Sequence, residues 1–305
     1  MDIPAHSAFQ QMAGMTVHLG VTGSVAAFKS LELLRMLQEV GIRATACITE
    51  SGQRFVTPLS MSALGAELVD QTLFDPSRDN YAHLRPGMEA DAFIIAPATA
   101  NILAKAAHGL ADDILSCQVL SYPRSILFAP AMNSRMLEAA PTQDNLELLR
   151  KRGHTILDAA SGSLACGEIG SGRLAEPREL LSATLKSLAP QDMDGLKVMV
   201  TLGRTEEAWD SVRRWTNPSS GKMGGAIAIA AWLRGAEVHA IQGPGDVYLP
   251  MGIHRHDIKT AQELFEAASS LWPDMDVACC VAAVCDFRPK PFEQGKFKKS
   301  QASQG

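Results

Sequence analysis

A single thiol, Cys166, stands in the glycine-rich stretch SGSLACGEIGSGRLAEP, residues 161–177. Its four glycines disfavour both helix and strand, so the sequence predicts a long loop here. A structural cysteine is usually buried among apolar residues, and the neighbours of Cys166 are mostly small or polar. An accessible thiol is prone to oxidation. Cys166 therefore either has a chemical role or is present by an accident of composition.

The segment GVTGSVAAFK predicts a phosphate site between a strand and a helix. It places Gly20, Gly23 and Ser24 at the turn. The free N–H groups and the positive dipole end of a helix start favour an anion there. The segment lacks the third glycine of a dinucleotide fingerprint, and a plain turn with a capping serine is the alternative.

Two later predicted strands also end in small residues followed by polar side chains. APATAN (96–101) offers small residues with the polar side chains of Thr99 and Asn101, and APAMN (129–133) follows one strand later. Either segment can be simple helix-capping and turn chemistry. Because carboxyl ends of parallel strands meet at one edge of a sheet, the three segments together predict a common ligand crevice.

Three further features have both a functional and a plain interpretation. His83 follows the turn FDPS and is either catalytic or a surface or capping residue. NPSSGKMGG (217–225) is similar to a phosphate loop but is not a Walker A motif, and its Lys222 is placed to hold a polyphosphate. KFKK (296–299) adds three lysines, which otherwise form a solvated basic tail.

The elements that must position these residues alternate between strand and helix, which predicts a parallel sheet covered on both faces. In the first part of the chain we expect strands at 15–23, 42–49, 90–99, 125–132 and 154–159, and helices at 24–41, 51–65, 101–108, 112–122 and 141–153. After a polar linker (188–195) the pattern restarts with strands at 196–203 and 236–243 and a third strand, or strand plus turn, at 275–287. A loop running into a helix is expected at 219–235 and a helix at 260–272.

The chain therefore divides into two α/β units, near 14–188 and 195–305. The second has about three predicted strands, fewer than a doubly wound sheet usually carries, so we expect that unit to be incomplete.

Composition narrows the class of protein. The 305 residues are 46% hydrophobic and 20% charged with a net charge of −5, which suits globular domains and disfavours disorder and nucleic-acid binding. No apolar run is long enough for a membrane span, and the first 13 residues lack the pattern of a signal peptide, so we expect neither. The six cysteines form no CxxC pair, and four lie in apolar segments expected to be buried, which indicates reduced thiols in the cytoplasm.

Taken together, these motifs resemble the bacterial bifunctional phosphopantothenoylcysteine decarboxylase/phosphopantothenate–cysteine ligases of coenzyme A biosynthesis. The first unit matches through GVTGSVAAFKSLELLRML, FVTPLSMSAL, APATANILAKAAHGLADDILS, PAMNSRM and ACGEIGSGRLAEP. The second matches through SSGKMG, VAAVCDFRP and KFKK. The resemblance implies a flavodoxin-like FMN-binding decarboxylase domain at 14–188 and a partial Rossmann-like ligase domain at 195–305.

In the first unit the resemblance implies FMN as cofactor and 4′-phosphopantothenoylcysteine as substrate. It assigns the flavin site to Gly23, Ser24, Thr49, Thr99, Ala100, Asn101 and Met132. It assigns the chemistry to His83, Asn133 and Cys166, where Asn133 holds the substrate carboxylate and Cys166 donates a proton once carbon dioxide has left. The family's motif tryptophan is Leu137 here, a position of packing.

In the second unit the resemblance implies CTP and magnesium, which activate phosphopantothenate for joining to cysteine. It assigns the site to Asn217, Ser219, Ser220, Gly221, Lys222, Met223, Asp286, Lys298 and Lys299 and leaves the metal ligands open. The sequence departs from the family at LGRT (202–205), NPSSG and VCDFRP, and it ends just after KFKK. We therefore expect this chain by itself not to ligate.

The resemblance also implies a homo-oligomer built from trimers, as large as a dodecamer, with small molecules as the only other partners. Two alternatives stay open. One is a decarboxylase of peptide carboxy-terminal cysteines, and the other is a non-catalytic flavin-binding or regulatory subunit. A yellow protein that releases FMN on denaturation distinguishes a flavoprotein from a nicotinamide-binding reductase.

Overall fold

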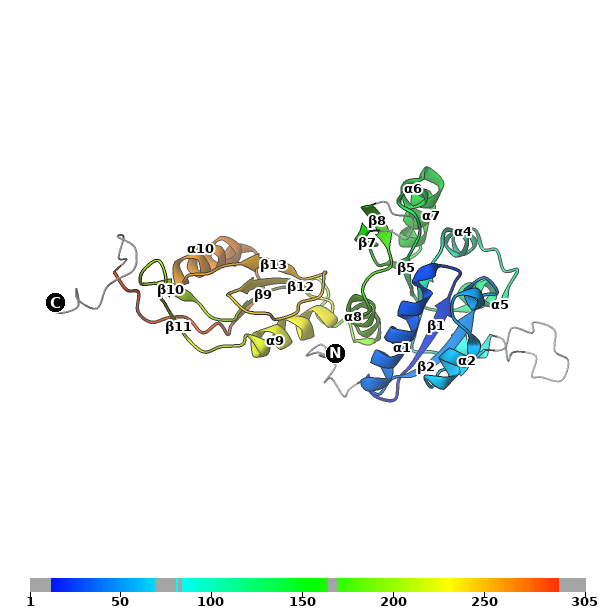
Figure 1. Cartoon of the computed structure of the whole chain (residues 1–305), viewed down its shortest axis with the longest axis horizontal. Helices are drawn as coiled ribbons and strands as arrows, with labels where there is room; N and C mark the ends of the chain where they lie inside the picture. The colour runs from blue at the N-terminus through cyan, green and yellow to red at the C-terminus, as the bar shows by residue number, and fades with distance from the viewer. Residues whose placement is uncertain (1–11, 70–80, 82–83, 164–168, 291–305) are drawn as a thin grey trace. The chain divides into compact units, whose positions relative to one another are not determined.

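The computed structural model describes residues 12–69, 81, 84–163 and 169–290. Contacts divide the chain into two compact units, the first ending at Leu188 and the second beginning at Ala189. Each unit has its own parallel sheet with helices packed on it (Figure 1). Among the described residues no helix is long and apolar enough to cross a membrane.

The first unit contains a six-stranded sheet in the order β3-β2-β1-β4-β5-β6, with parallel ladders throughout. The chain starts in the middle of the sheet, builds outward to β3 and then returns to the other side of β1. This reversal between β1 and β4 creates a topological switch point, where ligands bind beyond the carboxyl ends of the strands. The strands are β1 Thr16–Val21, β2 Arg43–Ile48, β3 Glu67–Leu68, β4 Ala92–Ala98, β5 Ile126–Pro130 and β6 Thr155–Ile156.

The predicted α/β class and parallel sheet are confirmed, and most predicted helices lie where the apolar spacing put them. The main helices are α1 Phe28–Glu39, α4 Ala100–His108, α5 Ile114–Ser121, α7 Ala140–Lys151 and α8 Pro177–Leu188. The shorter ones are α2 Pro58–Ala63, α3 Arg85–Glu89, α6 Ser134–Glu138 and the 3-10 turns η3 Val25–Ala27 and η4 Gly52–Arg54.

The core of the first unit lies between the central strands and the helices. Every residue of β4 is buried, which explains its uninterrupted apolar sequence. Phe93 and Phe128 are almost fully buried, and their burial contributes up to about 3 kcal/mol each to folding. This rigid base fixes the strand ends that carry the candidate site.

The stretch around Cys166 is a correction to the sequence-based expectation. Residues 161–177 were expected to be loop, but β7 Ala160–Ser163 and β8 Ile169–Arg173 pair as antiparallel strands. Two of the glycines are needed by this hairpin, since Gly162 has φ +153 and Gly172 has φ +138. An added Cβ at Gly172 would also lie 2.3 Å from the Met132 carbonyl oxygen. Tertiary packing therefore overrides the low strand propensity of glycine.

The second unit contains a four-stranded parallel sheet in the order β13-β12-β9-β14, one strand more than the sequence predicted. Its strands are β9 Lys197–Leu202, β12 Glu237–Gln242, β13 His254–Asp257 and β14 Val277–Cys280, with a separate hairpin of β10 Glu206–Ala208 and β11 Arg214–Thr216. Its helices are α9 Lys222–Leu233, α10 Ala261–Leu271 and the 3-10 turn η5 Trp272–Asp274. The sequence HRHD of β13 is wholly polar, which an edge strand tolerates and periodicity does not detect.

The cysteines also depart in part from expectation. Cys47, in the central part of the first sheet, is buried, whereas Cys280 at the end of β14 is exposed. Cys280 is exposed because β14 forms an edge of its sheet, where an apolar sequence does not ensure burial.

Candidate functional site

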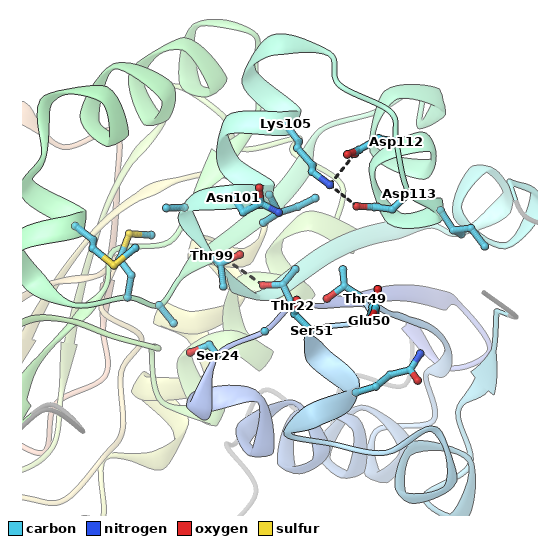
Figure 2. A pocket seen from close by; sticks show the side chains of 18 residues that line it. Thr22, Ser24, Thr49, Glu50, Ser51, Thr99, Asn101, Lys105, Asp112 and Asp113 are labelled. Atoms are coloured by element: carbon cyan, nitrogen blue, oxygen red, sulfur yellow. Dashed lines mark hydrogen bonds and ion pairs between the residues drawn. The ribbon is translucent and has the colours of Figure 1, made fainter. Parts of the chain in front are cut away.

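A cavity of about 870 Å³ lies at the carboxyl ends of the strands of the first unit. Its lining comes from segments that directly follow β1, β2, β4 and β5 (Figure 2). All seven residues expected to form a cofactor site line it: Gly23, Ser24, Thr49, Thr99, Ala100, Asn101 and Met132. The structure therefore brings together side chains that are separated by more than a hundred positions in the sequence.

The floor of the cavity is held by Thr22, which the sequence analysis missed. Its hydroxyl donates to the Pro97 carbonyl oxygen at 2.7 Å and accepts from the Thr99 N–H at 3.2 Å. Figure 2 shows Thr22 beside Thr99 with this second bond drawn. Thr22 is only 3% exposed, so the end of β1 is fixed to the end of β4. A polar residue directly after a buried strand was the available signal.

The segment after β2 is folded tightly against β1. The Thr49 hydroxyl accepts from the Gly52 N–H at 3.1 Å and donates to the Val21 carbonyl oxygen at 3.4 Å. An added Cβ at Gly23 would lie 2.5 Å from Cβ of Ser51, so glycine is required for this close approach. Backbone amides and small polar side chains therefore face the cavity from both strand ends.

Two helix starts contribute to the same wall. The Ser24 side chain accepts from the Ala26 N–H at 3.3 Å and caps the turn that leads into α1. The nine-residue helix α4 begins at Ala100, and its N-cap residue Thr99 makes no side-chain capping bond. Uncapped N–H groups and the positive end of the helix dipole favour an anionic group on this side of the cavity.

A charged cluster of Lys105, Asp112 and Asp113 lines the cavity as well (Figure 2). Lys105 Nζ lies 2.7 Å from Asp112 Oδ1 and 2.6 Å from Asp113 Oδ2. Burial tends to lower the pKa of Lys105, but the hydrogen bonds with both aspartates outweigh it, and the pKa is raised. Asp113 also accepts from the Ser116 N–H at 2.8 Å and so caps α5. In the sequence these residues are not distinguishable from an ordinary charged surface.

The polar residues Glu50, Ser51 and Gln53 also line the cavity, and the rest of the lining is apolar. It comes from Ile102, Ile114, Ala131, Met132 and Met136. An apolar wall beside a row of amides and hydroxyls suits a ligand with a flat ring at one end and an anion at the other.

The hairpin that flanks residue 166 packs directly on the loop that follows β5. The Met132 N–H donates to the Gly172 carbonyl oxygen at 3.0 Å. An added Cβ at Gly170 would lie 2.3 Å from Ser134 Oγ, which shows how closely β8 approaches this loop. The motif around Cys166 and the motif PAMN are therefore in contact, although they are far apart in the sequence.

The three predicted catalytic residues are only partly placed. Asn133 is adjacent to Met132 but does not line the cavity itself. Its Oδ1 accepts from the Arg135 N–H at 2.9 Å and caps α6. His83 and Cys166 lie outside the described residues, as do Lys298 and Lys299 of the second unit.

In the second unit the predicted loop precedes α9 and is shaped by its own side chains. Ser219 Oγ accepts from the Gly221 N–H at 3.3 Å, and Ser220 Oγ accepts from the Lys222 N–H at 3.4 Å. Gly221 has φ +73, and an added Cβ there would lie 3.1 Å from Gly203 at the end of β9. The loop is thus positioned at the carboxyl edge of the second sheet.

The other predicted residues of this unit lie at or near that loop. Asn217 Nδ2 donates to the Val284 carbonyl oxygen at 2.9 Å, which joins the loop to the segment after β14. Asp286, two positions further on, is exposed, as are Lys222 and Met223. Sequence reasoning missed Arg204, whose Nη1 donates to the Ser219 carbonyl oxygen at 3.4 Å.

Comparisons with known proteins agree with this architecture. Residues 6–189 match the family described as flavoprotein, and residues 193–304 match the DNA/pantothenate metabolism flavoprotein C-terminal domain. The chain is 40% identical over 296 residues to the coenzyme A biosynthesis bifunctional protein CoaBC of Escherichia coli, covering 96% of this chain and 73% of that one. The corresponding protein of Vibrio vulnificus is 36% identical over 295 residues, covering 96% of this chain and 74% of that one.

A solved structure is similar to the first unit. It is a PPC decarboxylase mutant complexed with pantothenoylaminoethenethiol, with 31% identity and a TM-score of 0.52, and the match covers 55% of this chain and 95% of that one. The fold and the cavity thus define a flavodoxin-like flavoprotein of the decarboxylase class. With both units considered, the chain belongs to the bifunctional CoaBC family of coenzyme A biosynthesis.

Proposed function

We propose that the first unit binds FMN and decarboxylates 4′-phosphopantothenoylcysteine to 4′-phosphopantetheine. The observation that carries this proposal is the convergence of seven family-matched residues on one cavity. Membership of the CoaBC family supports the same reaction.

The lining of the cavity suits FMN at both ends. The start of α4, which lines the cavity together with Gly23 and Ser24, offers backbone N–H groups and a helix dipole to a phosphate. The apolar wall that includes Ile114 and Met132 offers a surface for the isoalloxazine ring. The volume of about 870 Å³ is within the range of cofactor pockets.

When bound, FMN supplies the two-electron acceptor that lets the carboxylate leave from beside the substrate's thiol-bearing carbon. We assign the substrate carboxylate to Asn133. Its Oδ1 accepts from the Arg135 N–H, and the NH₂ of an amide is a hydrogen-bond donor of the kind that a carboxylate accepts. Cys166 is assigned as the donor of the proton that replaces carbon dioxide, and His83 assists its transfer.

Contact between the hairpin and the PAMN loop supports the assignment of Cys166. The strands β7 and β8 lead to and from residues 164–168, and β8 is bonded to Met132, which lines the cavity. This arrangement brings the ends of the segment that carries the thiol close to the residues assigned to cofactor and substrate.

For the second unit we propose CTP, with magnesium, as the ligand of the loop before α9, and phosphopantothenate and cysteine as substrates. The twelve-residue helix α9 begins at Lys222 without a side-chain cap from Gly221, and the positive end of its dipole suits a polyphosphate. Lys298 and Lys299 are assigned to charge neutralisation on the phosphates, and Asn217 to the carboxyl that is activated. We also propose a trimer-based homo-oligomer, which light scattering after gel filtration tests.

Mass spectrometry after incubation with phosphopantothenoylcysteine tests the decarboxylase. We expect a yellow protein that releases FMN on denaturation and a product lighter by one carbon dioxide. Cys166→Ser is expected to keep the flavin and stop before the finished product, whereas Cys280→Ser, an exposed thiol of the second unit, leaves turnover unchanged. Complete turnover by Cys166→Ser contradicts its role. Conversion of a cysteine-terminated peptide instead of the phosphopantothenoyl substrate contradicts the proposed specificity.

A further inference from the structure

Three histidines and a glutamate gather on one face of β12 and β13 in the second unit. His239 and His254 are register partners in the parallel ladder, and Glu237 precedes His239 by two positions. Side chains two apart on a strand, and register partners on neighbouring strands, point to the same face. The alternation follows this rule around His239, since its two neighbours Val238 and Ala240 are buried.

The distances within the group are those of potential metal ligands. One donor atom each of Glu237, His239 and His254 lies within 4.8 Å of the other two. His239 Nε2 is 3.1 Å from Glu237 Oε1. In a tetrahedral zinc site with bonds of about 2.0 Å, neighbouring donor atoms are about 3.3 Å apart. His239 and Glu237 are already close to this spacing, whereas His254, which is exposed, must rotate toward them when the ion binds.

A fourth residue, His256, fixes the orientation of the central imidazole. His239 Nδ1 is 3.1 Å from His256 Nε2, on the opposite side of the ring from Glu237. The two rings are stacked with centroids 5.4 Å apart. If His239 Nδ1–H donates to His256, the lone pair of Nε2 faces the glutamate, as a metal ligand requires. Such a partner of the second ring nitrogen accompanies most metal-bound histidines.

We propose that Glu237, His239 and His254 form a binding site for a borderline transition metal ion such as Zn²⁺, with His256 as the positioning residue. Imidazole and carboxylate donors are the set that Zn²⁺ accepts, and three protein ligands leave a fourth position for water. The side chains of Glu237 and His254 are exposed, so the ion has access from solvent.

The site is separate from the loop proposed to hold CTP. Glu237 and His239 lie at the start of β12, whereas Gly221 approaches Gly203 and Val247 beyond the carboxyl ends of the strands. From His239 to the end of β12 at Gln242 is about 10 Å at the rise of a parallel strand. The proposed ion site is therefore distinct from the loop before α9.

The test is titration of the full purified chain with Zn²⁺ by calorimetry, in the presence of excess Mg²⁺ and a reductant. We expect one equivalent to bind to the original chain and to be lost in His239→Ala and in His254→Asn. His256→Gln is expected to weaken binding by about 10- to 100-fold, as outer partners of metal-bound histidines do. His108→Ala, an exposed histidine of the first unit bonded to Asn145, is the matched control and leaves binding unchanged.

A second readout guards against loss of folding. Circular dichroism should be the same for all variants, and Zn²⁺ should raise the unfolding midpoint of the original chain but not of His254→Asn. The proposal is wrong if the double variant His239→Ala/His254→Asn binds Zn²⁺ as the original chain does. It is equally wrong if the original chain, the variants and the control all bind Zn²⁺ only weakly and without a defined stoichiometry, as scattered surface groups do.

Discussion

The hydroxyl of Thr22 accepts a hydrogen bond from the Thr99 N–H at 3.2 Å and donates one to the Pro97 carbonyl oxygen at 2.7 Å. One buried side chain thus joins the ends of β1 and β4 at the switch point of the sheet. The cavity depends on this link, because the segments on both sides of it supply its lining.

Thr22→Val should weaken both stability and flavin binding. Valine has the same shape but leaves the Thr99 N–H and the Pro97 carbonyl oxygen without this partner, at a cost of about 1–3 kcal/mol. Thr22→Ser keeps the hydroxyl and is the control. The measurements are denaturant unfolding and the fraction of FMN retained after gel filtration. Equal flavin retention by the valine and serine variants would contradict the positioning role.

Lys105→Met should reduce the affinity for FMN. The lysine neutralises Asp112 and Asp113 in the cavity, and without it two carboxylates face a ligand that carries a phosphate. We expect the dissociation constant to rise about tenfold, which corresponds to about 1.4 kcal/mol. Lys151→Met, which removes an exposed pair with Glu147 in α7, is the control and should leave FMN binding unchanged. Fluorescence titration of the flavin measures both variants.

The buried His18 should make stability depend on pH. Burial lowers its pKa from 6.5 to about 4, and the hydrogen bond to Gln118 offsets only part of this effect. The folded form holds the neutral ring, which accepts from the Thr45 hydroxyl and donates to Gln118 Oε1. The imidazole of His18 takes up a proton at higher pH in the unfolded chain than in the folded one. The contribution of neutral His18 to the free energy of unfolding is therefore complete above pH 6.5 and falls as the pH drops towards 4.

Between pH 7 and pH 5 the loss from His18 amounts to about 2 kcal/mol. Urea unfolding at the two pH values measures it in the original chain and in His18→Gln, which does not titrate. The variant is expected to be less stable at pH 7 but to lose about 2 kcal/mol less on acidification. Identical losses in the two proteins would show that another group is responsible.

Gly172→Ala should separate flavin binding from turnover. A Cβ at this position lies 2.3 Å from the Met132 carbonyl oxygen, so the hairpin must move away from the PAMN loop. We expect decarboxylation to fall by at least about tenfold, an expected effect of about 1.4 kcal/mol, while most FMN is retained. Gly153→Ala also replaces a glycine with positive φ, +86, but has open space around it, and it controls for backbone strain without a clash.

Gly243→Ala should unfold the second unit selectively. Its Cβ would lie 1.9 Å from the Arg204 carbonyl oxygen, a clash with backbone that no side-chain rotation relieves. Gly195→Ala, with φ +80 and nothing within 4 Å, is the control for strain without a clash. We expect the first variant to lose the unfolding transition of the second unit and to keep its flavin absorbance. Loss of the flavin in Gly243→Ala would show that the first unit needs the second to fold.

Much of the fold was predictable from local pattern. The all-apolar run of β4 and the leucine spacing of α1 identify a buried strand and an amphipathic helix without tertiary information. The hairpin β7–β8 was not predictable in this way, because glycines such as Gly172 serve a contact with a distant loop. The strand β13 was missed because its residues are polar and its pairing with β12 is what makes it a strand.

By itself the sequence determined the α/β class, the division into two units, and the small polar residues that follow the central strands, since each of these depends on neighbours along the chain. Only the tertiary structure decided that Thr22 links two strand ends, that Lys105 is paired inside the cavity and that His239 meets His254 across a ladder. These contacts join residues brought together by the sheet order. That order depends on the packing of the whole core, which local spacing does not encode.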